Sequence, residues 1–245
     1  MPRFFVSPEQ IGEKTLHLAG KDAWHIARAL RMAVGQEITV SNMQGERFVC
    51  RLAEIRDEHV TADILAREPD TAEPPFAATL YQALPKGDKM GEIVEKAVEC
   101  GVARIVPVLS ARCVSRPDAK SFAAKRARWQ KIAESAAKQS GRGIIPEIAP
   151  LVSLDAAVAE LARADVALLC YEGERTTSLG AAIRARGIVG KQVGFLVGSE
   201  GGFSEAEAAS AVAAGVTAVG LGPRILRTET AAAFVLACLS YEAEL

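Results

Sequence analysis

The chain has 245 residues, of which 49% are hydrophobic and 24% charged, and its net charge is −1. This composition excludes a disordered tail protein and a collagen-like fibre, and it suits one large globular domain or two small ones. The start of the chain lacks the apolar core of a signal peptide, and the apolar run from Ala231 to Leu239 is far shorter than the roughly 20 residues of a membrane span. We therefore expect a soluble cytoplasmic protein that binds any polyanion through a local patch.

Residues 1–72 are predicted to form mainly short strands. Segments 36–42 and 45–55 flank the turn-like sequence Asn42–Gly45, which favours a hairpin, and 59–65 favours a further strand. Several short strands within about seventy residues indicate a small β-barrel.

One short helix is expected before these strands, over residues 22–32, with Asp22 as its N-cap. The side chains expected on its apolar face are Trp24, Ala27 and Leu30. Cations on or near this helix and the first strand are Arg3, His25, Arg28 and Arg31. They form either a solvated face or a basic edge that the barrel presents to RNA. Nine cations against eleven acidic residues give residues 1–72 a net charge of −2, which supports the solvated face.

A linker is predicted at 67–76, a proline-rich segment without apolar periodicity, and we place the domain boundary near residue 72. Strands and helices alternate after it, which predicts an α/β domain with a parallel sheet covered on both faces. The expected strands are 78–84, 103–109, 165–171, 191–197 and 216–222. The expected helices are 88–100, 119–140, 153–163, 175–186, 204–214 and a last one from about 228.

A basic segment stands out at 111–142. It holds nine Lys and Arg against two acidic residues, a net charge of +7 in a chain whose total is −1. Such a segment is either a solvated helix face or a surface that follows the phosphates of a nucleic acid. Because the positive charge is concentrated in one segment of a nearly neutral chain, the two interpretations are about equally well supported.

A glycine-rich loop follows the predicted strand at 191–197. It runs Gly198-Ser199-Glu200-Gly201-Gly202 and leads into a helix with a capping box at Ser204 and Glu207. Glycines after a strand allow a ligand close to the backbone, although neither the dinucleotide fingerprint nor the P-loop spacing is present. Glu200 either accepts hydrogen bonds from a ligand or braces the loop.

A second glycine-bearing loop leaves the strand at 216–222 and continues as LGPRILRTETAAAF, in which Thr228 is expected to cap the last helix. Two such loops at the carboxyl ends of neighbouring strands predict a ligand site. Arg227 and Glu229, taken alone, suit an ordinary surface ion pair. The five cysteines contain no C-x-x-C pair and the three histidines have no ligand spacing, so we expect no metal.

These motifs resemble those of the bacterial 16S ribosomal RNA uridine N3-methyltransferases, the RsmE family of the SPOUT class. The resemblance covers nearly the whole chain, and its most specific parts are VGSEGGFSEAE and LGPRILRTETA. Further parts are MPRFFV, the H-x-x-R-x-L-R-x-x-x-G stretch from His25 to Gly35, LPKGDKMGEIVEKAVECGVARIVPVLSARCV and RARWQKIAESAAKQSGRGIIPEI. Ser199 departs from the family, which commonly has proline there, and we expect this to alter loop stiffness more than chemistry.

The resemblance implies a PUA-like, RNA-binding β-barrel at 1–72. It also implies a SPOUT methyltransferase domain at 73–245, whose parallel sheet ends in a C-terminal trefoil knot. S-adenosylmethionine would bind between the loops at 196–202 and 221–227, and the family is a homodimer. The implied cofactor-binding residues are Leu196, Val197, Gly198, Glu200, Gly201, Gly202, Leu221, Gly222, Ile225, Leu226 and Thr230.

The implied reaction methylates uracil N3, whose proton must leave because the neutral imide is a poor nucleophile. Glu200 is the expected base and Arg227 the expected stabiliser of the N3 anion, with Glu229 as second candidate for the base. The partner would be 16S rRNA in the decoding region of the small subunit. The residues expected to bind it are Arg3, His25, Arg28, Arg31, Lys86, Arg126, Arg128 and Arg142.

Three alternatives remain beside this expectation. A SPOUT enzyme could act on another RNA target, since one fold permits several functions. A non-catalytic RNA-binding or ribosome-assembly module would need only the barrel and the basic helix, although the two intact loops speak against it. A nucleotide-dependent oxidoreductase is disfavoured because no G-x-G-x-x-G follows a strand.

Overall fold

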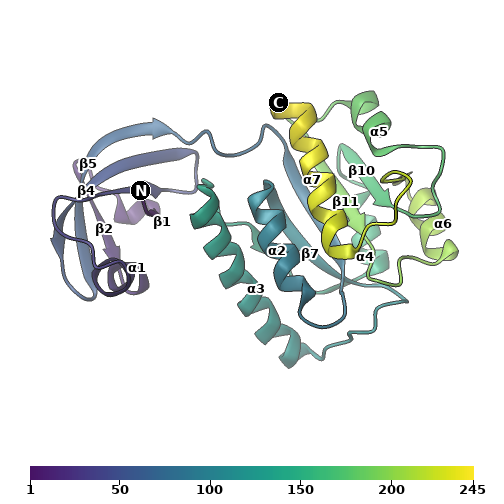
Figure 1. Ribbon diagram of the computed structural model, residues 1–245, viewed down its shortest axis with the longest axis horizontal. Coiled ribbons are helices and arrows are strands. Elements are labelled where there is room, and N and C mark those ends of the chain that lie inside the picture. Colours follow the sequence, from purple (N-terminus) through teal and green to yellow (C-terminus); the bar gives the residue numbers. More distant parts are fainter. The chain divides into compact units, whose positions relative to one another are not determined.

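The computed structural model describes residues 1–245, which form two compact units (Figure 1). The first unit comprises Met1–Glu73 and Ala137–Ile145, and the second comprises Pro74–Ala136 and Pro146–Leu245. The sequence places a boundary near residue 72, but nothing in it assigns the distant segment 137–145 to the first unit. None of the helices combines the length and hydropathy that a membrane crossing requires.

The first unit is built on a five-stranded sheet in the order β1-β3-β4-β5-β2. Its strands are β1 (Arg3–Phe5), β2 (Thr15–Ala19), β3 (Glu37–Ser41), β4 (Glu46–Ile55) and β5 (His59–Pro69), and a single 3₁₀ turn, η1 (Pro8–Gln10), follows β1. The predicted hairpin is confirmed, because β3 and β4 pair antiparallel with Ser41 opposite Arg47. Fully buried side chains such as Phe4, Leu16 and Phe48 form the core of this unit.

The prediction of one regular α-helix over residues 22–32 is wrong. Helix α1 (Lys21–Trp24) passes directly into a π-helical turn, η2 (His25–Ala29), and Gly20 rather than Asp22 precedes it as the N-cap. The amide of Leu30 donates to the carbonyl of His25 at 2.8 Å, so the turn is wider than an α-turn. On either side of this turn Trp24 and Leu30 are exposed, whereas Ala23 and Ile26 are buried.

The second unit has the predicted α/β architecture with a parallel sheet. Its strands run β12-β10-β11-β6-β7-β8, with β9 beside β7, and every pairing is parallel. The strands are β6 (Ala77–Ala83), β7 (Val102–Leu109), β8 (Glu147–Ile148), β9 (Val152–Ser153), β10 (Val166–Cys170), β11 (Gln192–Val197) and β12 (Thr217–Val219). The helices are α2 (Lys89–Glu99), α3 (Ala119–Ser140), α4 (Leu154–Leu161), α5 (Leu179–Arg186), α6 (Glu205–Ala213) and α7 (Thr228–Glu244). Helices α2 and α7 pack against each other beside the sheet (Figure 1).

The helix starts near the glycine loops are fixed by side-chain hydrogen bonds. The capping box of α6 is confirmed, with the Glu207 amide donating to Ser204 Oγ at 3.2 Å and the Ser204 amide donating to the Glu207 carboxylate at 2.8 Å. The predicted cap of α7 is wrong: Arg227 occupies the N-cap position. The Thr228 hydroxyl instead donates to the carbonyl of Gly198 at 2.6 Å, which joins the last helix to the loop after β11.

Candidate functional site

A pocket of about 360 Å³ lies where the chain leaves three neighbouring parallel strands, β10, β11 and β12. Its lining comes from within 170–175, 197–203 and 220–228, together with Ala231 of α7. This volume lies in the range of roughly 300–1,000 Å³ that small-molecule sites occupy. The carboxyl edge of a parallel sheet is also where α/β domains bind ligands. The pocket is therefore the candidate site of the second unit.

Both predicted glycine loops reach this pocket, but not every predicted residue does. Those that line it are Val197, Gly198, Glu200, Gly202, Leu221, Gly222, Ile225 and Leu226. Leu196 is fully buried inside the sheet, and Gly201 turns outward, with its carbonyl accepting a hydrogen bond from Arg112 at 2.8 Å. Thr230 lies one turn into α7 and is exposed away from the lining. The expectation that these three residues contact the cofactor is thus not supported by their positions.

The sequence reasoning missed the third wall of the pocket. It is formed at the end of β10 and just after it, by Cys170, Tyr171, Glu172, Glu174 and Arg175. Strand β10 lies between β11 and β12 in the sheet, so the segment after it must end beside both glycine loops. The strand itself is recognisable in the sequence, but this strand order is not, and the segment carries no glycine motif of its own.

Close backbone packing explains several of the glycines. A Cβ on Gly198 would stand 3.0 Å from the Cα of Gly202, and one on Gly220 would stand 2.7 Å from the carbonyl oxygen of Glu174. Real Cβ atoms essentially never approach backbone as closely as the 2.7 Å at Gly220, and the 3.0 Å at Gly198 is a tight contact. Gly202 also has a positive φ of 63°. The loop at 198–202 is thus folded tightly on itself, and the segments after β10 and β12 touch through their main chains.

A buried glutamine holds two of these loops together. Gln82, at the end of β6, is fully buried, and its side-chain amide donates to Thr228 Oγ1 at 2.9 Å. The same hydroxyl donates to the Gly198 carbonyl, so a chain of hydrogen bonds runs from β6 through α7 to the loop after β11. Because buried polar groups are costly without partners, this chain fixes the relative position of the two loops.

The sequence and the fold match known RNA methyltransferases. Residues 72–240 match the family described as RNA methyltransferase domain, and residues 18–65 match the RNA methyltransferase PUA domain. The ribosomal RNA small subunit methyltransferase E of Bacillus subtilis is 32% identical over 100% of this chain and 98% of its own length. That of Synechocystis is 33% identical over 96% of this chain and 76% of its own. The chain belongs to the ribosomal RNA small subunit methyltransferase E family.

A solved structure agrees with this membership. The ribosomal RNA small subunit methyltransferase E of Neisseria gonorrhoeae, bound to S-adenosyl methionine, is similar to this chain with a TM-score of 0.87 and 34% identity. The similarity covers 98% of this chain and 97% of that one. The similarity between the two methyltransferases therefore extends over both units of this chain, from the PUA domain to the last helix.

In this methyltransferase, Glu200 is held on the wall of the pocket by two lysines. Its carboxylate accepts a hydrogen bond from the amide of Lys86 at 3.1 Å and pairs with Lys89 Nζ at 2.9 Å. Burial raises the pKa of the Glu200 carboxyl, but the hydrogen bonds from Lys89 and Lys86 outweigh it, so the pKa lies below its ordinary value. This geometry fits a brace for the loop, and a lowered pKa makes Glu200 a weaker base than a free carboxylate.

The other two catalytic candidates of the methyltransferase differ in their access to the pocket. Arg227 lines it, and its side chain is 82% exposed. Glu229 does not line the pocket, and its nearly buried carboxylate lies 3.5 Å from Lys89 Nζ and 4.0 Å from Arg227 Nη1. Arg227 therefore presents an exposed cation at the pocket, whereas Glu229 lies outside the pocket lining.

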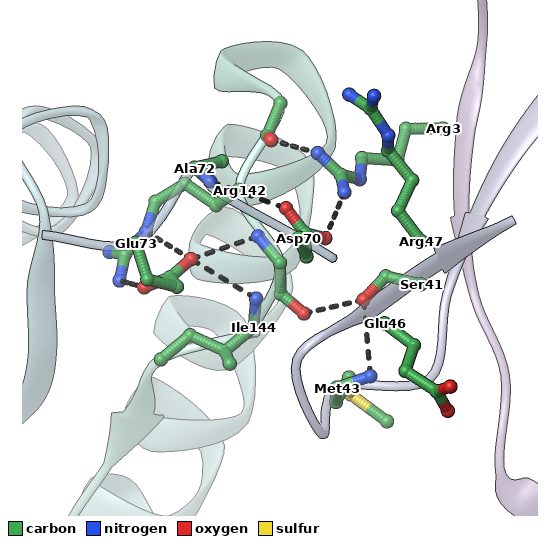
Figure 2. Close-up of polar contacts among 12 residues, drawn as sticks. Arg3, Ser41, Met43, Glu46, Arg47, Asp70, Ala72, Glu73, Arg142 and Ile144 are labelled. Carbon is green, nitrogen blue, oxygen red and sulfur yellow. Dashed lines mark hydrogen bonds and ion pairs between the residues drawn. The ribbon is translucent and has the colours of Figure 1, made fainter. Parts of the chain in front are cut away.

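Arg3 and Arg142, both expected at the RNA, are buried inside the first unit (Figure 2). Arg3 donates to the Gly141 carbonyl and pairs with Asp70, and Arg142 pairs with Glu73. The segment that carries Arg142 is tied further by Ser41, whose hydroxyl donates to the Gly143 carbonyl at 2.7 Å. Both arginines thus fasten residues 137–145 to the strands, and their burial corrects the expectation that they bind RNA.

The remaining predicted RNA-binding residues of the methyltransferase are exposed or half-buried. Arg126 donates to the Ile148 carbonyl at 2.6 Å, Arg128 lies 3.3 Å from Asp88, and Arg28 lies 2.5 Å from Asp57. The others, all exposed, are His25, Arg31 and Lys86. Exposed ion pairs of this kind are weak, so a phosphate can replace the carboxylate at little cost.

Proposed function

We propose that this chain transfers a methyl group from S-adenosylmethionine to N3 of a uridine in the 16S rRNA of the small ribosomal subunit. The observation that carries the proposal is the pocket built by the three loops at the carboxyl edge of the sheet. RNA methylation agrees with membership of the family, and the N3 position rests on the likeness of the two glycine-bearing loops to those of the uridine N3-methyltransferases.

The residues of the pocket suit this cofactor. S-adenosylmethionine supplies an electrophilic methyl group on a positively charged sulfur. The backbone of Leu221, Ile225 and Leu226 can hold the adenine by hydrogen bonds, since none of these residues lies in a helix or strand. The carboxylate of Glu172, exposed on the opposite segment, provides a negative charge that complements a cationic ligand.

Arg227 is placed to act on the nucleobase. Uracil N3 becomes nucleophilic only after it loses its proton, and the resulting anion is stabilised by a nearby cation. The guanidinium of Arg227 is always charged and stands exposed at the pocket, so it can approach a base that enters there. Glu200 remains the candidate proton acceptor, with the brace as its competing role, and Glu229 is the second candidate.

The C-terminal part is proposed to form the trefoil knot of the SPOUT class. The Thr228–Gly198 hydrogen bond and the packing of α7 on α2 and β11 support a last segment that is tucked beside the loop after β11. The proposed homodimer is supported by α7, where Phe234 and Tyr241 stand seven residues apart on one exposed face. Sedimentation should then give twice the chain mass of 25.9 kDa.

The first unit and α3 are proposed to hold the rRNA. The PUA match at 18–65 and the exposed His25, Arg28 and Arg31 support contact of the first unit with RNA. In the second unit, Lys86, Arg126 and Arg128 add cations that can approach phosphates. The target uridine is stacked or paired in rRNA, so it must be turned out to reach the pocket.

Methyl transfer to unmethylated small ribosomal subunits tests the proposal. Purified protein is incubated with labelled S-adenosylmethionine and the subunits, and the nucleosides are separated by mass spectrometry. Formation of 3-methyluridine is the expected result. Cofactor binding without 3-methyluridine would contradict the proposed target, and a different methylated nucleoside would assign the enzyme to another RNA position.

A substitution at Gly220 tests the cofactor site by itself. A Cβ there must displace the carbonyl oxygen of Glu174, which stands only 2.7 Å away, so Gly220→Ala should separate two walls of the pocket. We expect affinity for S-adenosylmethionine, measured by calorimetry, to fall at least roughly tenfold, a loss of about 1.4 kcal/mol. Gly180→Ala is the matched control, because its Cβ meets only the flexible guanidinium of Arg184. Equal affinities of all three proteins would contradict the assignment.

A further inference from the structure

An exposed tryptophan lies on the first unit, outside all the residues assigned so far. Trp24, at the end of α1, is 56% exposed, whereas Trp129, the other tryptophan of the chain, is 6% exposed and packs edge-on against Phe122. A single exposed apolar residue needs no explanation by itself. Trp24, however, is the largest side chain that the sequence pattern assigns to the core and the structure places in solvent.

A π-helical turn, η2, begins directly after Trp24. In this segment Ala23 and Ile26 take the buried positions, and Trp24, the last residue of α1, is exposed. Arg31, just after the turn, has a positive φ of 50°, which is uncommon for a residue with a side chain. Irregular turns of this kind occur frequently at functional sites. The fold thus maintains an unusual backbone next to an exposed indole.

Trp24 also forms one wall of an open hollow. The residues that line this hollow are Gly20, Lys21, Trp24, His25, Asp57 and Glu58, and its volume is about 880 Å³. The indole therefore presents a ring beside groups that can donate and accept hydrogen bonds. An aromatic face next to such groups is the arrangement with which proteins bind unstacked bases of RNA.

The charges around Trp24 favour a nucleic acid as the occupant. Lys21 and His25 flank the indole in the hollow, and Arg31 is exposed with no carboxylate within ion-pair distance. The hollow also holds the carboxylates of Asp57 and Glu58, of which Asp57 is neutralised by Arg28 at 2.5 Å. A nucleotide has a phosphate, which the cations can contact, and a base, which the aromatic ring can contact.

We propose that Trp24 is a stacking platform for an unpaired base of the RNA substrate, with Lys21 in the same hollow and Arg31, seven residues along the chain, for the flanking phosphates. The inference rests on the proposed function, because it takes RNA as the substrate. It assigns a site on the first unit that is separate from the methyl-transfer pocket. The base stacks on the indole without regard to its identity, since every base has a π-face.

Tryptophan fluorescence tests the stacking directly. Oligoadenylate of about ten nucleotides is titrated into the full-length protein, and inorganic polyphosphate of similar charge serves as the probe without bases. The same titrations of Trp24→Phe give the signal of Trp129, whose subtraction leaves that of Trp24. We expect oligoadenylate to quench Trp24 emission and polyphosphate to leave it unchanged. Equal responses to the two polymers, or no response to oligoadenylate, would overturn the proposal.

Variants separate stacking from loss of structure. Trp24→Ala should weaken oligoadenylate binding by roughly tenfold, whereas Trp24→Phe keeps a ring and should lose less than about half of that effect. Val34→Ala, at an exposed aliphatic residue of the same unit, is the matched control and should bind as the unmodified protein does. Equal losses in Trp24→Ala and Val34→Ala would contradict an aromatic contact.

The methyl-transfer assay distinguishes this inference from the function on which it rests. With ribosomal subunits, Trp24→Ala should raise the KM for the RNA and leave kcat unchanged. If the unmodified protein methylates the subunits but RNA does not quench Trp24 fluorescence, the stacking platform is overturned and the proposed function stands. If assembled subunits quench Trp24 fluorescence but naked RNA does not, Trp24 contacts a ribosomal protein instead of a base. This result would also overturn the stacking platform.

Discussion

Replacing Arg227 by alanine is expected to lower turnover at saturating S-adenosylmethionine by at least roughly tenfold, since removing one stabiliser of a developing anion costs about 10²–10³ in kcat where it has been measured. The reason is the exposed position of its guanidinium at the pocket, where the N3 anion would form. Cofactor affinity should stay within about twofold, because the loss falls on the transition state rather than on binding. Single-turnover methylation, with calorimetry of the cofactor, measures both quantities.

Arg224→Ala is the matched control, since Arg224 is an exposed arginine on the same loop and also lines the pocket. It should keep turnover near that of the unmodified protein. If both variants lose turnover equally, the general positive charge of the loop matters and Arg227 has no special role. Near-normal turnover of Arg227→Ala would remove it from the mechanism.

Two variants of Glu200 separate its two candidate roles. Glu200→Ala should lower turnover at least about tenfold in either role, because it removes both a base and a brace. Glu200→Gln keeps an oxygen that accepts the Lys86 amide but cannot take a proton at neutral pH. Turnover near normal in Glu200→Gln therefore indicates the brace, and a loss equal to that of Glu200→Ala indicates the base.

A second large effect is expected in stability rather than in catalysis. Arg3→Met should lower the free energy of unfolding by about 3–5 kcal/mol, because it leaves the Asp70 carboxylate buried without its partner. The side chains of this pair are only 7% and 2% exposed. Burial also lowers the pKa of the Arg3 guanidinium, which Asp70 partly offsets, so each charge depends on the other. Urea denaturation measures the change.

The double variant Arg3→Met, Asp70→Leu removes both charges and should recover most of the loss, since an apolar pair can replace a buried ion pair. Arg56→Met is the exposed control, as Arg56 and Glu54 form a pair whose side chains are 72% and 50% exposed. It should change stability by less than about 1 kcal/mol. A small effect of Arg3→Met alone would show that Arg3 does not fasten the segment at 137–145.

Local pattern was sufficient for much of the fold and for two walls of the site. Alternation of strands and helices predicted the parallel sheet, and the turn at Asn42–Gly45 predicted the β3–β4 hairpin. The loops at 198–202 and 221–227 could be found because each combines a strand end, glycine and a helix start. Signals of this kind lie within a dozen residues and do not depend on which strands are neighbours.

Features that depend on distant contacts could not be predicted in this way. The wall at 170–175 is part of the pocket only because β10 lies between β11 and β12. Arg3 appeared available to RNA because its partners, the Gly141 carbonyl and Asp70, lie far along the chain. Trp24 was assigned to an apolar face because a helical wheel groups it with Ala27 and Leu30, whereas the packing of α1 on β2 and β5 buries Ala23 instead.

The return of residues 137–145 to the first unit has a consequence for biosynthesis. The partners of the Glu73 carboxylate are Arg142 and the amide of Gly143, which donates to it at 2.8 Å, and both residues are synthesised after the whole of α3. The first unit therefore cannot complete its polar contacts when residue 73 leaves the ribosome. A nascent chain cut before residue 137 would leave Glu73 without Arg142 and Gly143, and Arg3 without the Gly141 carbonyl. The amino-terminal part therefore matures only after residues 74–136 of the second unit have been translated.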